Sequence, residues 1–157
     1  MDRKDGNPHS YWGFVKDPIH GYIRLTETER KILDTGPVQR LRRIKQLSAA
    51  EYVYPAATHT RFEHALGTMY LAGIVADNLP TDFEENMRKT LKVAALLHDV
   101  GHAPFSHLFE PMLVKYLGKT HEDMSTRIIL ESELHDTLMS EGLDAKTLSK
   151  LCVGKLD

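Results

Sequence analysis

The pattern of apolar and polar residues predicts two long amphipathic helices in the middle of the chain. Apolar side chains recur at helical spacing in both segments. They are Phe62, Leu66, Met69, Tyr70, Gly73 and Ile74 in the first segment, and Met87, Leu91, Ala94, Ala95 and Leu97 in the second. Gly101 and Pro104 then end the second helix, because both residue types disfavour a continued helix.

Four segments match the capping box, in which a threonine is followed three residues later by an acidic side chain. They are Thr26 to Glu29, Thr60 to Glu63, Thr81 to Glu84 and Thr120 to Asp123. Between residues 14 and 25, alternating β-branched and aromatic residues around a His-Gly pair predict a short hairpin. The predicted fold is therefore mostly α, one helical domain over residues 13–157 with a short N-terminal β-hairpin, preceded by a flexible arm of residues 1–12.

Composition narrows the class of protein. A chain of 157 residues that is 41% hydrophobic can bury one core. The net charge of −2, and a basic cluster without interleaved aromatic residues, argue against nucleic acid as a partner. The single cysteine, Cys152, excludes an internal disulfide, and the apolar stretch 69–76 is too short to span a membrane. We therefore predict a soluble, cytoplasmic protein with no membrane partner.

Histidines are unusually frequent, and several fall close together. His64 lies one turn into the first long helix, and His98 and Asp99 lie at the end of the second. If the two helices are antiparallel neighbours, these three side chains converge. Two imidazoles and a carboxylate suit a divalent ion such as zinc, iron or manganese, with coordination positions left for water or substrate.

A His-Asp dipeptide alone is weak evidence, because such pairs are usually hydrogen-bonded side chains without a metal. Further acid and base groups follow directly, however: His102, His107, Glu110, His121 and Glu122. Each of them singly is more often a solvated loop residue. Together they indicate a reaction site.

The order of the motifs resembles the HD superfamily of metal-dependent phosphohydrolases. It is most similar to the deoxynucleoside triphosphate triphosphohydrolases, including the animal enzyme that joins a sterile-alpha-motif domain to an HD domain. The matching blocks are DPIHGYIRL, ILDTGPVQRLRRIKQL, YPAATHTRFEHALG, LLHDVGHAPFSHLFE and THED. The resemblance runs from about Phe14 to Thr126 and implies an HD-domain helical bundle.

The resemblance implies a role for each matching residue. The implied ligands of a divalent ion (zinc, iron, manganese or magnesium) are His64, His98 and Asp99. The groups around the triphosphate and the reacting water are His102, His107, His121 and Glu122, with Arg61 contacting phosphate and Gln46 and Leu47 contacting deoxyribose. The implied reaction is attack at the α-phosphorus of a dNTP, which yields deoxynucleoside and inorganic triphosphate. We assign the general acid to His107, and Glu110 stands where the family carries an aspartate.

A regulatory site is also implied, because Asp34, Gln39 and Arg42 match a guanine-nucleotide activator site of the animal enzyme. The same short segment carries Arg40, Arg42, Arg43 and Lys45, and such a run of charges is equally typical of a solvated face with salt bridges. Nucleotide regulation is therefore the weaker interpretation. The resemblance leaves a homo-oligomer open.

The end of the chain departs from the family pattern. Family members supply a fourth ligand, an aspartate in a block resembling DRLDYLxRD, and the last residues, VGKLD, resemble only the lead-in to it. Asp136, Asp144 and Asp157 lack that context, so we expect a truncated chain with three ligands and part of a substrate pocket. Two alternatives stay open: a catalytically silent HD fragment that binds nucleotide, and an HD phosphohydrolase acting on nucleoside monophosphates or cyclic nucleotides. The DPIHG and QRLRRIKQL blocks argue against the second.

Overall fold

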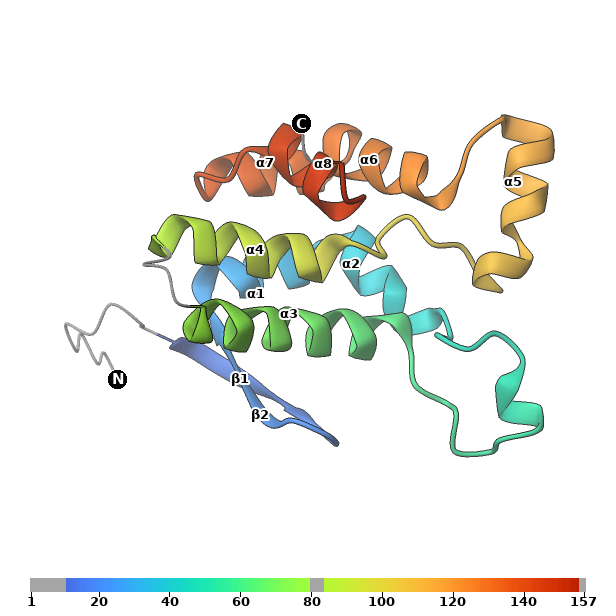
Figure 1. Cartoon of the computed structure of the whole chain (residues 1–157), viewed down its shortest axis with the longest axis horizontal. Helices are drawn as coiled ribbons and strands as arrows, with labels where there is room; N and C mark the ends of the chain where they lie inside the picture. Colours follow the sequence, from blue (N-terminus) through green and yellow to red (C-terminus); the bar gives the residue numbers. More distant parts are fainter. Residues whose placement is uncertain (1–10, 80–83, 156–157) are drawn as a thin grey trace.

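Helices α3 and α4 form the centre of the structure, a computed structural model that describes residues 11–79 and 84–155 (Figure 1). The strands are β1 Tyr11–Asp17 and β2 Gly21–Thr26. The helices are α1 Glu27–Leu33, α2 Gly36–Arg40, α3 Arg61–Asn78, α4 Glu85–Leu97, α5 Glu110–Leu117, α6 His121–Glu131, α7 Glu133–Ser140 and α8 Ala145–Cys152. Short 3₁₀ turns lie at Leu41–Arg43, Ala50–Tyr52 and Ser106–Leu108. The predicted helical fold with an N-terminal hairpin is confirmed.

The hairpin owes its turn to one aspartate and one glycine. The buried Asp17 carboxylate accepts hydrogen bonds from the backbone N–H groups of Ile19 and His20, at 2.9 and 2.8 Å. Gly21 follows with φ of +75°, a conformation that side chains with a Cβ disfavour. Strand β1 includes Tyr11 and Trp12, which the sequence pattern assigns to the arm. Tyr11 pairs with Thr26, and Trp12 lies at an irregularity of the register between Tyr11 and Gly13.

Capping boxes begin three of the helices, as the sequence predicts. Thr26, Thr60 and Thr120 each accept a hydrogen bond from the backbone N–H three residues later, and the acidic side chain there bonds back to the threonine N–H. The fourth predicted box, Thr81 to Glu84, lies largely outside the described residues, and α4 begins at Glu85 without a side-chain cap. These caps fix where α1, α3 and α6 begin.

The bundle is layered around α3 and α4. Figure 1 shows the two helices antiparallel, with the hairpin on the outer side of α3 and helices α6, α7 and α8 on the other side of α4. Helix α6 also packs against α8, and α1 joins the hairpin to the bundle. The largest fully buried side chains between these layers are Ile23, Ile32, Val38, Leu41, Leu66, Met69, Leu96, Leu97, Ile129, Leu134, Leu138 and Leu148.

Two of the apolar residues at helical spacing lie outside the core. Ile74 is 41% exposed and Met87 is 52% exposed, although both follow the helical spacing. They lie towards the end of the α3–α4 pair that is opposite the His-Asp motif, and spacing along one helix does not show where its packing partners stop. Within the described residues, no helix combines the length and the apolar character needed to cross a membrane.

A buried ion pair ties α1 to α4. The Lys92 ammonium contacts Glu29 Oε1, and the two side chains are 11% and 5% exposed. The other oxygen, Glu29 Oε2, accepts the Thr26 backbone N–H at 2.8 Å, so one carboxylate serves both a helix cap and an ion pair. The Lys92 stem also packs where a Cβ on Gly73 would lie, 3.3 Å from its Cε. Removing one partner of such a pair leaves a buried charge without compensation.

We therefore expect Lys92→Met to lower the free energy of unfolding by about 3 kcal/mol or more. The double variant Glu29→Gln/Lys92→Met should recover most of that loss, because the glutamine oxygen still accepts the Thr26 N–H and no charge is left buried. Urea denaturation followed by circular dichroism measures both. A loss under about 1 kcal/mol in the single variant would show that the pair is solvated and of little weight.

Candidate metal centre

The antiparallel packing of α3 and α4 brings together the three predicted metal ligands. His64 lies in the first turn of α3, and His98 and Asp99 directly follow the last residue of α4. His64 Nε2 lies 3.2 Å from His98 Nε2 and 3.6 Å from Asp99 Oδ2, and His98 Nε2 lies 3.4 Å from Asp99 Oδ1. The three ligand atoms lie within 4.8 Å of one another, close enough to bind one ion.

The orientation of the His98 ring also fits the binding of a divalent metal. Its Nδ1 lies 2.8 Å from the Ala95 carbonyl oxygen, a contact in which Nδ1 carries the proton and donates. This tautomer leaves the Nε2 lone pair directed at His64 Nε2 and Asp99. A backbone carbonyl behind a ligating histidine is the usual arrangement around metal sites. Two facing imidazole nitrogens need a proton or a cation between them.

The surroundings keep Asp99 ionised and two of the imidazoles neutral. Burial alone would raise the pKa of the Asp99 carboxyl, but the hydrogen bond from His102 and the electrostatic effect of the neighbouring His98 ring and Arg61 guanidinium outweigh it and hold that pKa well below its ordinary value. Burial lowers the pKa of His64 and of His102, and this effect outweighs the nearby Asp99 carboxylate, which by itself would raise both pKa values. An ionised carboxylate and neutral imidazoles are the forms that bind metal.

Two arginines hold the motif in place. Arg61, the predicted phosphate contact, is 2% exposed, and its guanidinium donates a hydrogen bond to Asp99 Oδ2. Arg40 donates to the Val100 carbonyl oxygen at 2.7 Å, and burial lowers its pKa. The solvated-face interpretation is therefore wrong for Arg40, which binds the backbone one residue after the His98–Asp99 motif. Nothing in the sequence distinguishes Arg40 from the neighbouring basic residues, so its contact with Val100 could not be predicted.

The downstream acid and base groups form a second cluster beside the first. Glu110 Oε1 lies 2.7 Å from His121 Nδ1, and Glu110 Oε2 lies 3.3 Å from His107 Nδ1. These two hydrogen bonds, that of His121 foremost, lower the pKa of Glu110. His102 links the clusters, because its ring stacks on His121 with centroids 4.1 Å apart and its Nε2 lies 3.4 Å from Asp99 Oδ1.

Glu122 is the predicted site residue that this cluster leaves out. It is exposed one residue after His121 and makes no side-chain hydrogen bond within residues 11–79 and 84–155. The two described downstream aspartates, Asp136 and Asp144, are engaged with other groups than the metal ligands. Asp144 caps α8 by accepting the N–H groups of Lys146 and Thr147, Asp136 pairs with His135, and Asp157 is outside the described residues.

A close backbone contact positions α6 and therefore His121. Gly101 donates its N–H to Ser125 Oγ at 2.9 Å, and Ser125 is fully buried in α6. A Cβ on Gly101 would lie 2.2 Å from Ser125 N and 2.3 Å from the His121 carbonyl oxygen. Only glycine therefore lets α6 approach the motif. The sequence pattern marks Gly101 only as a helix end, and no motif in the sequence singles out Ser125.

The predicted sugar contacts lie on the loop before α3. The Gln46 N–H donates to the His59 carbonyl oxygen at 3.1 Å, and its side-chain Oε1 is buried without a hydrogen-bond partner in the described structure. Leu47 beside it is 47% exposed. A cleft of about 510 Å³ opens next to His64, between the hairpin turn, residues 56–59 and α3.

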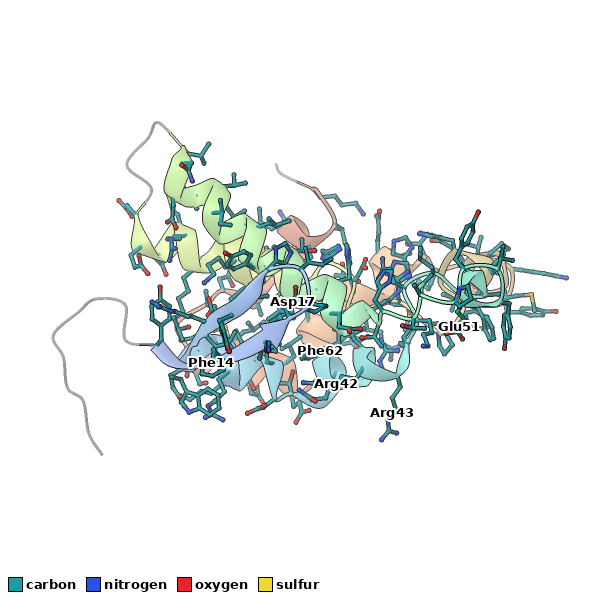
Figure 2. The ribbon with its side chains drawn as sticks, turned by 90° about the horizontal axis from the view of Figure 1, so that it is seen from below. Phe14, Asp17, Arg42, Arg43, Glu51 and Phe62 are labelled. Atoms are coloured by element: carbon teal, nitrogen blue, oxygen red, sulfur yellow. The ribbon has the colours of Figure 1, made fainter. Side chains whose placement is uncertain are left out.

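The predicted regulatory residues are only partly brought together. Arg42 donates to Gln39 Oε1 at 2.8 Å, and its guanidinium carbon lies 3.6 Å from the centroid of the Phe62 ring. Figure 2 shows Arg42 and Phe62 next to each other near the hairpin. Asp34 instead pairs with Arg30 at 2.8 Å. The regulatory role stays a prediction.

Comparison with known proteins agrees with this geometry. The HD domain family matches residues 61–151, which include all three candidate ligands and both clusters. The chain belongs to the HD domain family.

The similarity to individual relatives covers more of the chain than the HD domain match does. The chain is 39% identical over 150 residues to deoxynucleoside triphosphate triphosphohydrolase SAMHD1 of Xenopus laevis, covering 87% of the chain and 24% of that protein. It is 41% identical to an uncharacterized protein of Methanocaldococcus jannaschii, covering 86% and 30%. A crystal structure of a hypothetical protein from Aquifex aeolicus superimposes with a TM-score of 0.80 at 36% identity, covering 92% and 38%. The chain thus spans between 24% and 38% of the length of these relatives.

The Gly101 contact gives a test of how α6 is held. We expect Gly101→Ala to lower the free energy of unfolding by about 2–3 kcal/mol, because the added methyl group meets rigid backbone atoms. Gly13→Ala is the matched control, since a Cβ there meets nothing within 4 Å, and it should change stability by about 0.5 kcal/mol or less. Thermal and urea unfolding of both variants decide; equal stabilities would contradict the close packing of α6 on the motif.

Proposed function

We propose that this HD domain hydrolyses deoxynucleoside triphosphates to deoxynucleoside and inorganic triphosphate, with a divalent metal held by His64, His98 and Asp99. The observation that carries the proposal is the convergence of these three ligand atoms beside a second cluster of acid and base groups. The substrate class is supported by relatives named as deoxynucleoside triphosphate triphosphohydrolases, at 39% identity for the one from Xenopus laevis.

The metal, when bound, supplies Lewis-acid polarisation of a phosphoryl oxygen and a more acidic bound water. The chain's own groups do the rest. Arg61 donates a hydrogen bond to Asp99, and its positive charge beside the ligands favours the binding of an anionic phosphate group there. His107 is 73% exposed and accessible to a bound substrate, and it gives its proton to the departing 5′ oxygen. Glu110 orients His121 and His107 through the hydrogen bonds described above.

The sugar contacts are supported by an unusual polar atom. Gln46 Oε1 is buried without a partner in the described residues, and a buried acceptor costs free energy unless a donor such as a hydroxyl group pairs with it. A hydroxyl of the deoxyribose is such a donor. The exposed Leu47 side chain beside it offers an apolar surface to the sugar.

A second candidate is nucleotide binding without turnover. It is favoured by the described aspartates after the motif, because Asp136 and Asp144 are engaged elsewhere and add no fourth ligand to the three. Hydrolysis of nucleoside monophosphates or cyclic nucleotides needs the same metal centre. The named triphosphohydrolase relatives favour the dNTP substrate over it.

The test is a product assay on the chain with each dNTP and added Mn²⁺. We expect deoxynucleoside and tripolyphosphate in equal amounts, and no product after chelation. Asp99→Asn should lower the rate by about 100-fold or more, since loss of even an outer partner of a metal ligand costs about 10–100-fold. His135→Ala, a change in an exposed His-Asp pair outside the site, should leave the rate unchanged.

The other outcomes separate the candidates. Saturable nucleotide binding with no product under any metal would replace hydrolysis by the binding role. Inorganic phosphate from a monophosphate, with no tripolyphosphate from any dNTP, would overturn the proposed substrate.

A further inference from the structure

A cavity of about 300 Å³ lies between the hairpin and the helices α3 and α4, away from the metal ligands. Its lining comes from both strands, from α3 beyond Met69 and from the part of α4 that includes Arg88 and Lys92. Arg88 precedes His98 by ten residues, which is about 15 Å along a helix that rises 1.5 Å per residue. The cavity is therefore separate from the metal centre and from both clusters beside it.

The polar lining of this cavity combines three cations with three phenols. These residues are Arg24, Arg88 and Lys92, and Tyr11, Tyr22 and Tyr70. Within residues 11–79 and 84–155, the three phenol hydroxyl groups form no hydrogen bond, so each can donate to a ligand. The lining is therefore rich in hydrogen-bond donors, which favours an acceptor-rich ligand.

Two of the three cations are already compensated by carboxylates. Asp77, which also lines the cavity, accepts from Arg88 Nε at 2.7 Å and from Arg88 Nη2 at 2.9 Å. This pair fixes the guanidinium plane and leaves the Arg88 Nη1 group without a hydrogen bond in the described part of the chain. Lys92 is paired with Glu29, as described above.

Arg24 carries the remaining positive charge. Its guanidinium carbon lies 5.4 Å from the centroid of the Tyr11 ring, and among the described residues it has no carboxylate within ion-pair distance. Because the other charges of the lining are paired, the cavity has a net positive charge. Guanidinium groups beside such a cavity suit phosphate oxygens, which they bind through two parallel N–H donors.

The rest of the lining is apolar or aromatic. Met69 and Ile74 lie beside the tyrosine rings, and Gly73 leaves room because a Cβ there would come within 3.3 Å of Lys92 Cε. A volume of about 300 Å³ is at the lower end of the range for small-molecule sites. The cavity therefore suits a small ligand that has a planar apolar part as well as an anionic group.

We propose that this cavity binds a small organic phosphate, a phosphate monoester attached to an aromatic group. Arg24 and Arg88 bind the phosphate oxygens, and the tyrosine rings pack against the aromatic group. The site goes beyond the proposed function, because none of these residues belongs to the metal centre, the acid and base groups or the sugar contacts.

Phenyl phosphate is the probe, and amide ¹H–¹⁵N correlation spectra of the whole chain locate where it binds. The backbone amide of Gly73 reports on the cavity, and that of Gly101 reports on the metal centre. We expect a saturable shift of the Gly73 signal, with the same affinity in His98→Ala, which removes a candidate metal ligand. Inorganic phosphate and benzyl alcohol, which each carry half of the probe's chemistry, should bind more weakly.

Charge variants test which groups bind the phosphate. Arg24→Gln and Arg88→Gln should each weaken binding by about tenfold or more, the cost of one charge-assisted hydrogen bond. The matched control is Arg127→Gln, which changes an exposed arginine of α6 paired with Glu131, and it should bind phenyl phosphate as the parent does. Circular dichroism confirms that each variant is folded.

Several results would overturn the proposal. They are the absence of a saturable shift at Gly73, a shift at Gly101 alone, and a parent-like affinity in Arg24→Gln. Binding of benzyl alcohol as tight as that of phenyl phosphate would remove the phosphate from the proposal, and equally tight binding of inorganic phosphate would remove the aromatic group.

Discussion

A buried carboxylate stays ionised only where cations and hydrogen-bond donors surround it, and the Asp99 carboxylate imposes that requirement on this fold. It is 11% exposed, and it faces Arg61 from α3, His102 from its own loop and the nitrogens of His64 and His98. Each of these groups comes from a segment whose position is fixed by packing on another. The antiparallel packing of α3 and α4 therefore both buries apolar side chains and brings together the groups that surround the Asp99 carboxylate.

Two buried ion pairs stabilise that helix pair in different ways. Partway along α4, Lys92 pairs with Glu29 of α1, and the glutamate also completes a helix cap. At the end of the pair that carries the His-Asp motif, Arg61 and Asp99 form a buried pair whose carboxylate also faces two histidines. In the Glu29–Lys92 pair, both carboxylate oxygens are already bound, so the pair stabilises the fold and leaves no oxygen directed at a ligand. The second arrangement leaves lone pairs directed at one point, which is what an ion-binding centre requires.

His102 and Gly101 connect that centre to the rest of the site. His102 bonds Asp99 on one side and stacks on His121 on the other, so the two clusters are held at a fixed separation. Gly101 allows the backbone of α6 to approach, because no Cβ fits between the motif and Ser125. The short segment after α4 thus sets the geometry of groups that lie far apart in sequence.

The sequence by itself predicted the two central helices, the starts of α1, α3 and α6, and three candidate ligands that the structure brings together. Local or periodic patterns in the sequence carry these predictions: the capping boxes at Thr26, Thr60 and Thr120, and the positions of His64 and Asp99 on two helical segments. Such patterns persist in the structure because a cap and a helical turn depend only on residues near in sequence. Tertiary structure decided what spacing cannot express. Three features depend on which segment packs opposite: the hydrogen bond from Arg40 to the Val100 carbonyl, the burial of Ser125 and the exposure of Ile74. The packing partner of a residue produces no periodic pattern along the chain, so the sequence does not predict it.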